Sequence, residues 1–222
     1  MKSKIIVIEG LDGSGKATQA KILTETLAAR GLPVRRLEFP DYESPASAPV
    51  KMYLGGEFGS KPEDVNAYAA SAFYAVDRVA SYLRSWKRDY EQGTVLISDR
   101  YATSNIIYQM GKLSDEERDA YIRWQSDFEY EKLGLPRPDA VIYLDVAPEV
   151  SQRLMERRYG GDNSQKDLHE SNLRFLLHCR RSAVYAAEHC RWHVIDCCSG
   201  GDIRAVEEIA RDIEKIVNEL LC

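Results

Sequence analysis

The residues with the clearest chemical potential lie near the N-terminus, where residues 10–17 (GLDGSGKA) follow the apolar residues 5–8. This is the Gly-x4-Gly-Lys pattern of a phosphate-binding loop, in which glycines let successive backbone N–H groups turn toward a polyphosphate and the lysine adds a positive charge. A helix that begins at the end of the loop adds the positive end of its dipole. The expected nucleotide phosphate site comprises Gly10, Asp12, Gly13, Ser14, Gly15, Lys16, Ala17 and Thr18.

Two residues depart from the usual loop. Ala17 stands where a serine or threonine normally supplies a hydroxyl ligand to magnesium, and Asp12 places a carboxylate inside an anion-binding loop. Magnesium keeps several water ligands and can be held by nucleotide phosphates with one carboxylate behind them, so Ala17 does not exclude a magnesium-dependent reaction. Thr18 lies one position too late to replace the missing ligand, and its hydroxyl is expected near the α-phosphate.

A second group of polar residues, Asp99-Arg100-Tyr101, follows the apolar residues 95–98. Ligands of open parallel sheets bind at the carboxyl ends of the strands, which is where this group is expected to lie. An isolated Asp-Arg pair is more often a charge pair at a helix start, but a phosphate loop in the same chain favours a functional role. We expect Asp99 to hold Mg²⁺ through water and Arg100 to clamp a phosphate.

The elements that position these residues are visible as short apolar runs between longer helical stretches. The alternation indicates a parallel sheet with crossover helices on both faces, which is the three-layer α/β sandwich of P-loop NTPases. Asp202 is the expected N-cap of the last helix. The length of 222 residues suits a single domain, residues 1–222. The five expected strands are residues 5–8, 34–39, 94–98, 140–145 and 193–196.

Composition narrows the class of protein. The formal net charge of −5 argues against a nucleic-acid-binding protein, because counterion-driven binding needs a basic surface. The five cysteines are odd in number and form no Cys-x-x-Cys pair, which is typical of reduced thiols. No apolar stretch approaches the roughly 20 residues that a membrane span requires. We therefore expect a cytoplasmic protein that binds neither nucleic acid nor membrane.

The combination of motifs resembles the thymidylate kinase family over nearly the whole chain. The resemblance implies ATP- and Mg²⁺-dependent phosphoryl transfer to dTMP, giving dTDP and ADP, in a homodimeric enzyme. The residues that carry it are Glu9 to Asp12, Phe39-Pro40, residues 53–59 (YLGGEFG), Asp77-Arg78, Asp99-Arg100-Tyr101 and Ser104-Asn105.

The resemblance implies how the sugar and base of dTMP are bound. Asp12 accepts a hydrogen bond from the 3'-hydroxyl, an aromatic ring stacks on the thymine, and Arg78 donates to its O4. Tyr74 lies four positions before Arg78 and shares a helix face with it, so Tyr74 is preferred over Phe73, which is expected in the core. The implied dTMP site comprises Asp12, Phe39, Pro40, Tyr74, Arg78, Arg100, Ser104, Asn105 and Tyr108.

Further roles in that site also follow from the resemblance. Arg100 clamps the 5'-phosphate against a wall that Phe39 and Pro40 shape. Asn105 contacts the base, and Tyr108 crowds the 2' position, which favours deoxyribose.

A lid, at about residues 154–168, is expected to supply the catalytic cation. Some members of the family carry an arginine in the phosphate loop, whereas this chain has Gly13 there, so Lys16 and Arg100 need a further positive charge from the lid. The sequence leaves Arg157, Arg158 and Lys166 as alternatives.

On the ATP side, the resemblance places two more residues. Arg153 lies at the base of the lid, near the adenine or the phosphates. Cys198 belongs to the loop that lies against the adenine.

Two other functions stay open from the sequence. A deoxynucleoside kinase would need a carboxylate base to deprotonate a 5'-hydroxyl, and Glu38 is the candidate. A monophosphate acceptor is already ionised at neutral pH and needs an arginine clamp instead, which Arg100 and the lid cations favour. A nucleotide-binding protein with weakened transfer is the other alternative, and Ala17 is its support.

Overall fold

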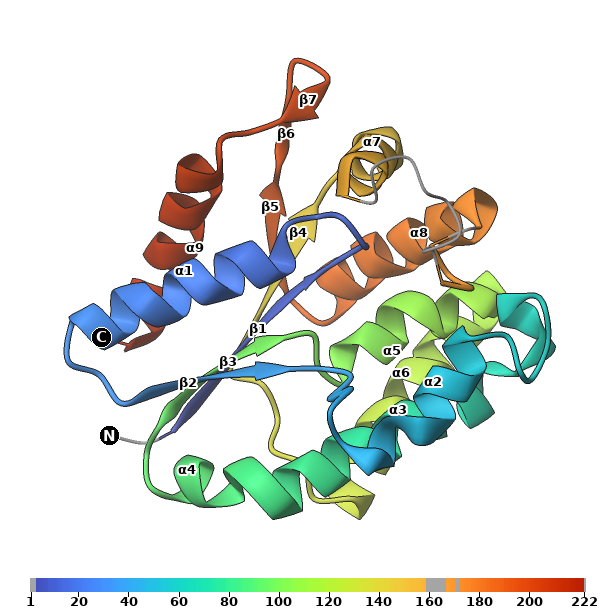
Figure 1. Cartoon of the computed structure of the whole chain (residues 1–222), viewed down its shortest axis with the longest axis horizontal. Helices are drawn as coiled ribbons and strands as arrows, with labels where there is room; N and C mark the ends of the chain where they lie inside the picture. The colour runs from blue at the N-terminus through green and yellow to red at the C-terminus, as the bar shows by residue number, and fades with distance from the viewer. Residues whose placement is uncertain (1–2, 159–166, 171, 222) are drawn as a thin grey trace.

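The computed structural model describes residues 3–158, 167–170 and 172–221, without the side chains of Arg157 and Arg158 (Figure 1). A five-stranded parallel sheet has the strand order β2-β3-β1-β4-β5, which confirms the predicted fold. In the register of the sheet, Asp99 is opposite both Ile8 and Glu38. The loops that follow the first three strands therefore begin at one edge. The strands are β1 (Lys4–Gly10), β2 (Val34–Glu38), β3 (Val95–Asp99), β4 (Ala140–Asp145) and β5 (His193–Asp196).

The central strands are apolar on both faces because helices cover both. Along β1, Ile5 and Val7 belong to one core cluster, and Ile6 and Ile8 to the other. Continuous apolar runs are typical of parallel strands buried on both sides. Successive side chains of β1 thus point to opposite faces of the sheet and contribute to both core clusters.

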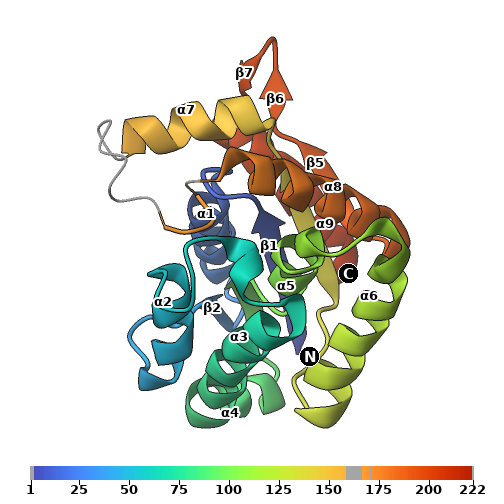
Figure 2. The same ribbon diagram turned by 90° about the vertical axis from the view of Figure 1, so that its right-hand side faces the viewer.

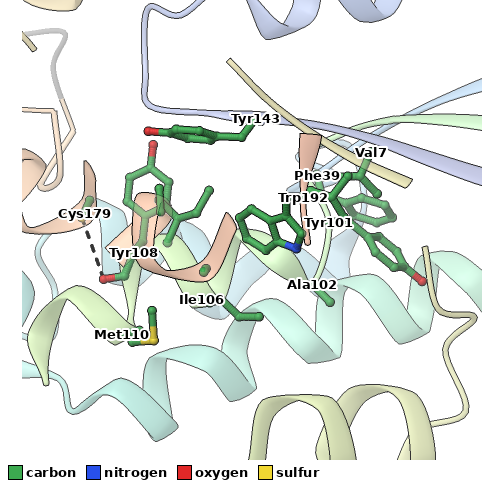
Figure 3. Close-up of a cluster of buried hydrophobic side chains, with 14 of the residues drawn as sticks. Val7, Phe39, Tyr101, Ala102, Ile106, Tyr108, Met110, Tyr143, Cys179 and Trp192 are labelled. Atoms are coloured by element: carbon green, nitrogen blue, oxygen red, sulfur yellow. Dashed lines mark hydrogen bonds between the residues drawn. The ribbon is translucent and has the colours of Figure 1, made fainter. Parts of the chain in front are cut away.

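The helices divide between the two faces. On one face, α1 (Lys16–Ala29) lies beside α9 (Val206–Leu221), and both contribute to one cluster (Figure 1). On the other, α5 (Thr103–Tyr108) packs against α8 (Leu173–His189). Figure 3 shows this second cluster, with Tyr108 next to Cys179. Helix α5, which carries the predicted site residues Ser104, Asn105 and Tyr108, is thus held in place by its packing against α8.

The remaining helices lie at both edges of the sheet, and α4 (Lys87–Glu91) is at the amino edge, where Ser3 Oγ donates to the Tyr90 carbonyl oxygen just before β1 begins. Figure 2 shows α7 beside the β6-β7 hairpin, with α2 and α3 lying together elsewhere in the molecule. Two π-helical segments, Tyr82–Trp86 and Asp127–Lys132, continue α3 and α6. The helices are α2 (Ala48–Leu54), α3 (Ala67–Ser81), α4 (Lys87–Glu91), α6 (Arg118–Ser126) and α7 (Pro148–Arg158), with 3-10 turns at Pro45–Ser47, Pro62–Asp64, Met110–Lys112 and Asp115–Glu117.

The prediction for Asp202 is wrong. Asp202 belongs to strand β7 (Asp202–Ile203), which pairs antiparallel with β6 (Cys198–Ser199), and α9 begins only at Val206. Gly200 and Gly201 have φ of 60° and 83° and form the hairpin turn between these strands. A Gly-Gly pair is a known hairpin signal, so the sequence contained the evidence for this turn.

No helix within the described residues is long and apolar enough to span a bilayer. Residues 159–166 of the predicted lid, and with them Lys166, lie outside the described residues.

Candidate functional site

The phosphate loop leaves the end of β1 and turns into α1 through glycines in the left-handed region. Gly15 precedes α1 with φ of 87°, a conformation that favours glycine. Gly13 has φ of 78°, and a Cβ there would lie 2.9 Å from Met155 Cγ and 3.0 Å from the Ser151 carbonyl oxygen. Ser151 Oγ also donates to the Asp12 carbonyl. Helix α7, which leads into the lid, therefore rests directly on the loop and fills the space beside Gly13.

Lys16 lies against the loop. Its Nζ donates to the Leu11 carbonyl at 2.7 Å, and its side chain is buried. Burial lowers the pKa of Lys16 to about 8, with the charge of Arg100 acting in the same direction. Ser14 Oγ is buried and has no hydrogen-bond partner among the described residues. The loop thus holds a buried cation and an unpaired hydroxyl at the expected phosphate site, while Ala17 and Thr18 are exposed on the first turn of α1.

Arg100, Asp12 and Tyr108 form a connected group at the carboxyl edge of the sheet. Arg100 has φ of 64°, and its Nη2 donates to Asp12 Oδ1. Tyr108 Oη donates to Asp12 Oδ2 at 2.8 Å, and the Arg100 guanidinium lies 5.1 Å from the Tyr108 ring centre. Burial opposes ionisation of Asp12, but the charges of Arg100 and Lys16 outweigh it and lower its pKa to about 2. Asp12 is therefore an anion between a cation and a phenol.

Glu9 fixes the segment that carries Arg100, a role that sequence reasoning missed. Its carboxylate is fully buried and accepts hydrogen bonds from Thr103 Oγ1 at 2.6 Å and Ser104 Oγ at 2.8 Å. The Tyr101 backbone N–H also donates to it at 3.2 Å. Burial raises the pKa of Glu9, against the charge of Arg100 and these hydrogen bonds. The end of β1 is thus tied to the turn after β3.

One pocket brings together all the residues predicted to bind dTMP. These residues are far apart in the chain and line one cavity. The role predicted for each of them stays a prediction. Residues that the prediction did not include also line it. The full lining is Asp12, Phe39, Pro40, Tyr42, Leu54, Tyr74, Arg78, Arg100, Tyr101, Ser104, Asn105, Tyr108, Gln109, Asp167 and His169.

The adjacent residues Phe73 and Tyr74 of α3 lie in different surroundings, and Tyr74 is the one that lines the pocket, as its spacing from Arg78 predicted. Tyr74 lines the pocket, and its ring meets the Tyr53 ring edge-on at 6.4 Å between centroids. Phe73 is outside the pocket lining, but its expected place in the core is wrong. It is only partly buried and packs on Phe58 at 5.4 Å, where Phe58 is itself exposed. The helix turns Phe73 toward the α2 loop rather than toward the sheet.

Arg78, which also lines the pocket, is buried and paired with Glu129. Arg78 Nε donates to Glu129 Oε2 at 2.6 Å, and Nη2 donates to Oε1. Burial alone would lower the pKa of Arg78, but the carboxylate of Glu129 raises it, which keeps the guanidinium charged. Asn105 Nδ2 also donates to Glu129 Oε1, at 3.0 Å. Glu129 is a further residue that the sequence analysis did not identify.

The end of the predicted lid and the residues directly after it add Asp167 and His169 to the pocket. His169 stacks on Tyr108, with 5.4 Å between ring centroids and 13° between planes, and its Nε2 lies 2.9 Å from Tyr53 Oη. Burial lowers the pKa of His169 to about 3, so the imidazole is neutral. Burial and the nearby charge of Asp12 raise the pKa of Asp167 to about 7. The run of titratable residues at the end of the predicted lid, Asp167, His169 and Glu170, was the available sequence signal.

The predicted magnesium residue, Asp99, lies close to Lys16 in a site of suitable chemistry. Asp99 is 6% exposed, and its charge acts on Lys16 to raise the lysine pKa against burial. Within residues 3–158, 167–170 and 172–221, no group of three or more His, Cys, Asp or Glu side chains has the arrangement of a metal site. A single carboxylate beside the loop fits a cation held mainly by phosphates and water, with the unpaired Ser14 hydroxyl nearby in the loop.

On the ATP side, Arg153 joins α7 to the β6-β7 hairpin. Its Nη2 donates to the Gly201 carbonyl at 2.7 Å and approaches Asp202 Oδ1 at 3.9 Å. Cys198 Sγ accepts a hydrogen bond from the Ala147 backbone N–H at 3.5 Å. These contacts bring both residues to the hairpin at the base of the lid. The side chains of Arg157 and Arg158 are not described, so the choice of lid cation stays a prediction.

Glu38, the candidate base of a deoxynucleoside kinase, lies outside the pocket lining. Its side chain is 57% exposed and pairs with Arg36 at 3.3 Å on the surface. The structure therefore does not favour that alternative.

Comparisons with known proteins identify the family and the fold. The family model described as thymidylate kinase matches residues 8–209. A thymidylate kinase of Mycobacterium tuberculosis is 32% identical over 186 residues, which is 82% of this chain and 84% of that protein. One from Plasmodium falciparum is 30% identical over 223 residues, covering 99% and 91%. A solved thymidylate kinase structure from Candida albicans superimposes with a TM-score of 0.70 at 21% identity, covering 98% and 92% of the two chains, and shares the fold.

Proposed function

The chain belongs to the thymidylate kinase family and catalyses the ATP-dependent phosphorylation of dTMP to dTDP, and we propose how its residues divide that work. The observation that carries the proposal is that Arg78, which is paired with Glu129, and Arg100, which is paired with Asp12, line the same pocket. An acceptor phosphate is already ionised, so the protein needs to align it and stabilise charge rather than remove a proton.

At the phosphate end, we propose that dTMP exchanges the partner of Arg100. In the structure, the guanidinium pairs with Asp12. A phosphate can compete for this guanidinium because it carries more charge than a carboxylate and can accept two parallel hydrogen bonds, whereas Asp12 accepts one from Arg100. Arg100 then clamps the 5'-phosphate against Phe39 and Pro40, and Asp12, still bound to Tyr108, accepts the 3'-hydroxyl.

At the base end, Tyr74 stacks on the thymine while Arg78 and Asn105 meet its hydrogen-bonding edge. Tyr108 stands over the sugar and leaves no room for a 2'-hydroxyl. Ser104 has a structural part, because its hydroxyl is bound to Glu9 and holds this end of α5 in place. These assignments make the pocket selective for a deoxyribonucleotide with a thymine base.

At the ATP end, the loop from Gly10 to Thr18 cradles the triphosphate, with Lys16 supplying positive charge. Asp99 would hold Mg²⁺ through water, and the bound ion would supply positive charge to the phosphates. Arg157, Arg158 or Lys166 adds the lid cation. Arg153 and Cys198 form the adenine side through the β6-β7 hairpin.

We also propose that the enzyme is a cytoplasmic homodimer that joins through the exposed face of α3. Tyr68, Val76 and Leu83 are 40%, 50% and 64% exposed and recur at spacings that place them along one side of α3 and its π-helical continuation. A two-fold dimer buries the same patch of both subunits, which suits a single apolar row. The free thiols at Cys179, Cys190, Cys197 and Cys198 are compatible with a reducing compartment.

The test is a coupled assay of ADP formation with a panel of acceptors. We expect transfer to dTMP with ATP and Mg²⁺, little transfer to the ribonucleotide that carries the same base, and none to thymidine. Transfer to thymidine in preference to dTMP would contradict the monophosphate acceptor. Equal use of the ribonucleotide would contradict the role of Tyr108, while leaving the reaction type intact.

A further inference from the structure

Glu129 is a carboxylate in the interior of the protein that belongs to none of the motifs in the sequence. Its side chain is fully buried and lies on the π-helical segment that continues α6. A π-helical turn changes the direction in which side chains leave the helix, and such turns often occur at functional sites. Arg78, Asn105 and Gln125 all donate hydrogen bonds to this one carboxylate. The geometry thus gathers donors from three helices on one acceptor.

The pairing determines which part of Arg78 is available to a ligand. Glu129 occupies the edge of the guanidinium formed by Nε and Nη2. Arg78 also lines the base end of the pocket. Because this edge of the guanidinium faces Glu129, the N–H groups left to donate into the pocket are the two of Nη1 and the second one of Nη2.

The same carboxylate determines the orientation of the Asn105 amide. Asn105 Nδ2 lies 3.0 Å from Glu129 Oε1 and 3.4 Å from the Ser71 carbonyl oxygen. A carboxylate and a carbonyl only accept hydrogen bonds, so the amide nitrogen must face them. Asn105 Oδ1 is consequently turned the other way, and the residue lines the pocket. Asn105 can then offer the pocket an acceptor, next to the donor from Arg78.

We infer that Glu129 is a positioning residue that fixes this donor and acceptor pair and thereby selects the imide edge of the base. Thymine presents a carbonyl acceptor at position 4 beside an N–H donor at position 3, which matches the pair. Cytosine presents an amino donor beside an unprotonated ring nitrogen, so donor meets donor and acceptor meets acceptor. The inference rests on the proposed roles of Arg78 and Asn105, and adds what sets their polarity.

The test compares dTMP with 5-methyl-dCMP, because the two acceptors share the methyl group and differ only at the edge that Arg78 and Asn105 face. We expect wild-type kcat/KM to favour dTMP by roughly 100-fold or more. In Glu129→Gln, one carboxylate oxygen becomes an amino group, Asn105 can turn its carbonyl toward it, and the pocket loses its fixed polarity. The ratio of kcat/KM for dTMP to kcat/KM for 5-methyl-dCMP should fall by roughly tenfold, mainly because the KM values for the two acceptors become more similar.

Two variants guard against a purely structural explanation. Glu131→Gln makes the same chemical change on the same π-helical segment, where the side chain is 57% exposed and pairs with Arg137, and it should leave the preference unchanged. Glu129→Asp keeps the negative charge beside Arg78 but is one methylene shorter. It replaces Glu129→Gln in the test if that variant does not fold, and it should reduce the preference for dTMP over 5-methyl-dCMP by less than tenfold.

The outcomes separate the inference from the proposed function. A folded Glu129→Gln variant that loses activity equally toward both acceptors would make Glu129 merely structural and overturn the inference. Wild-type enzyme that uses 5-methyl-dCMP as well as dTMP would overturn it too. Absence of transfer to any monophosphate would instead refute the proposed residue roles in transfer, and the same preference could then be measured as ligand-dependent thermal shifts.

Discussion

The pocket proposed to bind dTMP is lined by two arginines that are each paired with a carboxylate, Arg78 at the proposed base end and Arg100 at the proposed phosphate end, but the pairs differ in how firmly they are held. At the base end, the side chains of Arg78 and Glu129 are 2% and 0% exposed, and Asn105 and Gln125 add hydrogen bonds. At the phosphate end, those of Arg100 and Asp12 are 16% and 21% exposed, and Tyr108 adds one more. A buried pair with satisfied partners is a fixed part of the structure, whereas a partly exposed pair can exchange partners.

This difference suits the two halves of the ligand. The base must be recognised by groups that already have the correct polarity, because reorganising them on binding would weaken discrimination. The phosphate must displace an existing partner of Arg100, which requires a pair that opens without disturbing the fold. On the proposed roles, an arginine paired with a carboxylate thus serves recognition of the base at Arg78 and exchange with the phosphate at Arg100.

The largest effect is expected from breaking the buried pair. Glu129→Leu leaves the Arg78 charge buried without a partner and should lower the free energy of unfolding by about 3 to 5 kcal/mol. Asp12→Asn at the partly exposed pair should cost about 1 kcal/mol or less. Denaturant titration of both variants measures the difference. The double variant Arg78→Met/Glu129→Leu serves as control and should recover much of the loss, and similar costs for the two single variants would remove the distinction between the ends.

Arg100→Ala tests exchange at the phosphate end. We expect kcat/KM for dTMP to fall by roughly 10²- to 10³-fold, because the clamp on the acceptor phosphate is lost. The KM for ATP should change less than about threefold. Arg36→Ala, at a surface pair with Glu38, is the matched control and should be nearly neutral. Equal losses toward both substrates would place Arg100 between them instead of on the acceptor.

Asp167→Asn tests whether charge crowding weakens the phosphate end. The pKa of Asp167 is raised to about 7 by burial and by Asp12, so the stability that it contributes is present at pH below about 4 and is lost as the pH rises through about 7. The variant removes this loss and should be more stable than wild type at pH 8, on the order of 1 to 3 kcal/mol, with little gain at pH 4. Thermal melts at both pH values measure this. A gain of equal size at pH 4 would point to packing rather than charge.

The smallest effect is expected outside both pairs, at Ala17. Ala17→Ser restores a hydroxyl to the first turn of α1 and should lower the Mg²⁺ concentration needed for half-maximal rate by roughly threefold to tenfold. The preference among acceptors should not change. Magnesium titrations with dTMP test this, and a gain in rate of several orders of magnitude would instead show that the native loop is weakened.

The sequence allowed prediction of residues that belong to local patterns. The short β-rich runs located all five strands of the parallel sheet. The runs of β1, β3 and β4 are almost continuously buried because helices cover both faces, whereas the edge strands β2 and β5 are partly exposed. The spacing between Tyr74 and Arg78 chose the aromatic residue that lines the pocket. The Gly-Gly hairpin before α9 was overlooked, although its signal is also local.

Residues that depend on distant partners could not be predicted. Glu129 acquires its role only because a π-helical segment turns it toward Arg78 on another helix. Glu9 reads as part of a buried strand until the turn after β3 places hydroxyl groups around it. The position of Phe73 outside the core could not be predicted because its packing partner, Phe58, lies in the loop after α2.

The contact between α7 and Gly13 has a consequence for how such enzymes diverge. Because Met155 and Ser151 fill the space where any side chain at position 13 would start, a single codon change to arginine would introduce a clash before it could introduce a catalytic charge. Moving the cation from the lid to the loop would first require smaller residues, or a displaced helix, at the lid's base. The two placements of the charge are therefore separated by an intermediate that is worse than either, and lineages that begin on one side are expected to stay there.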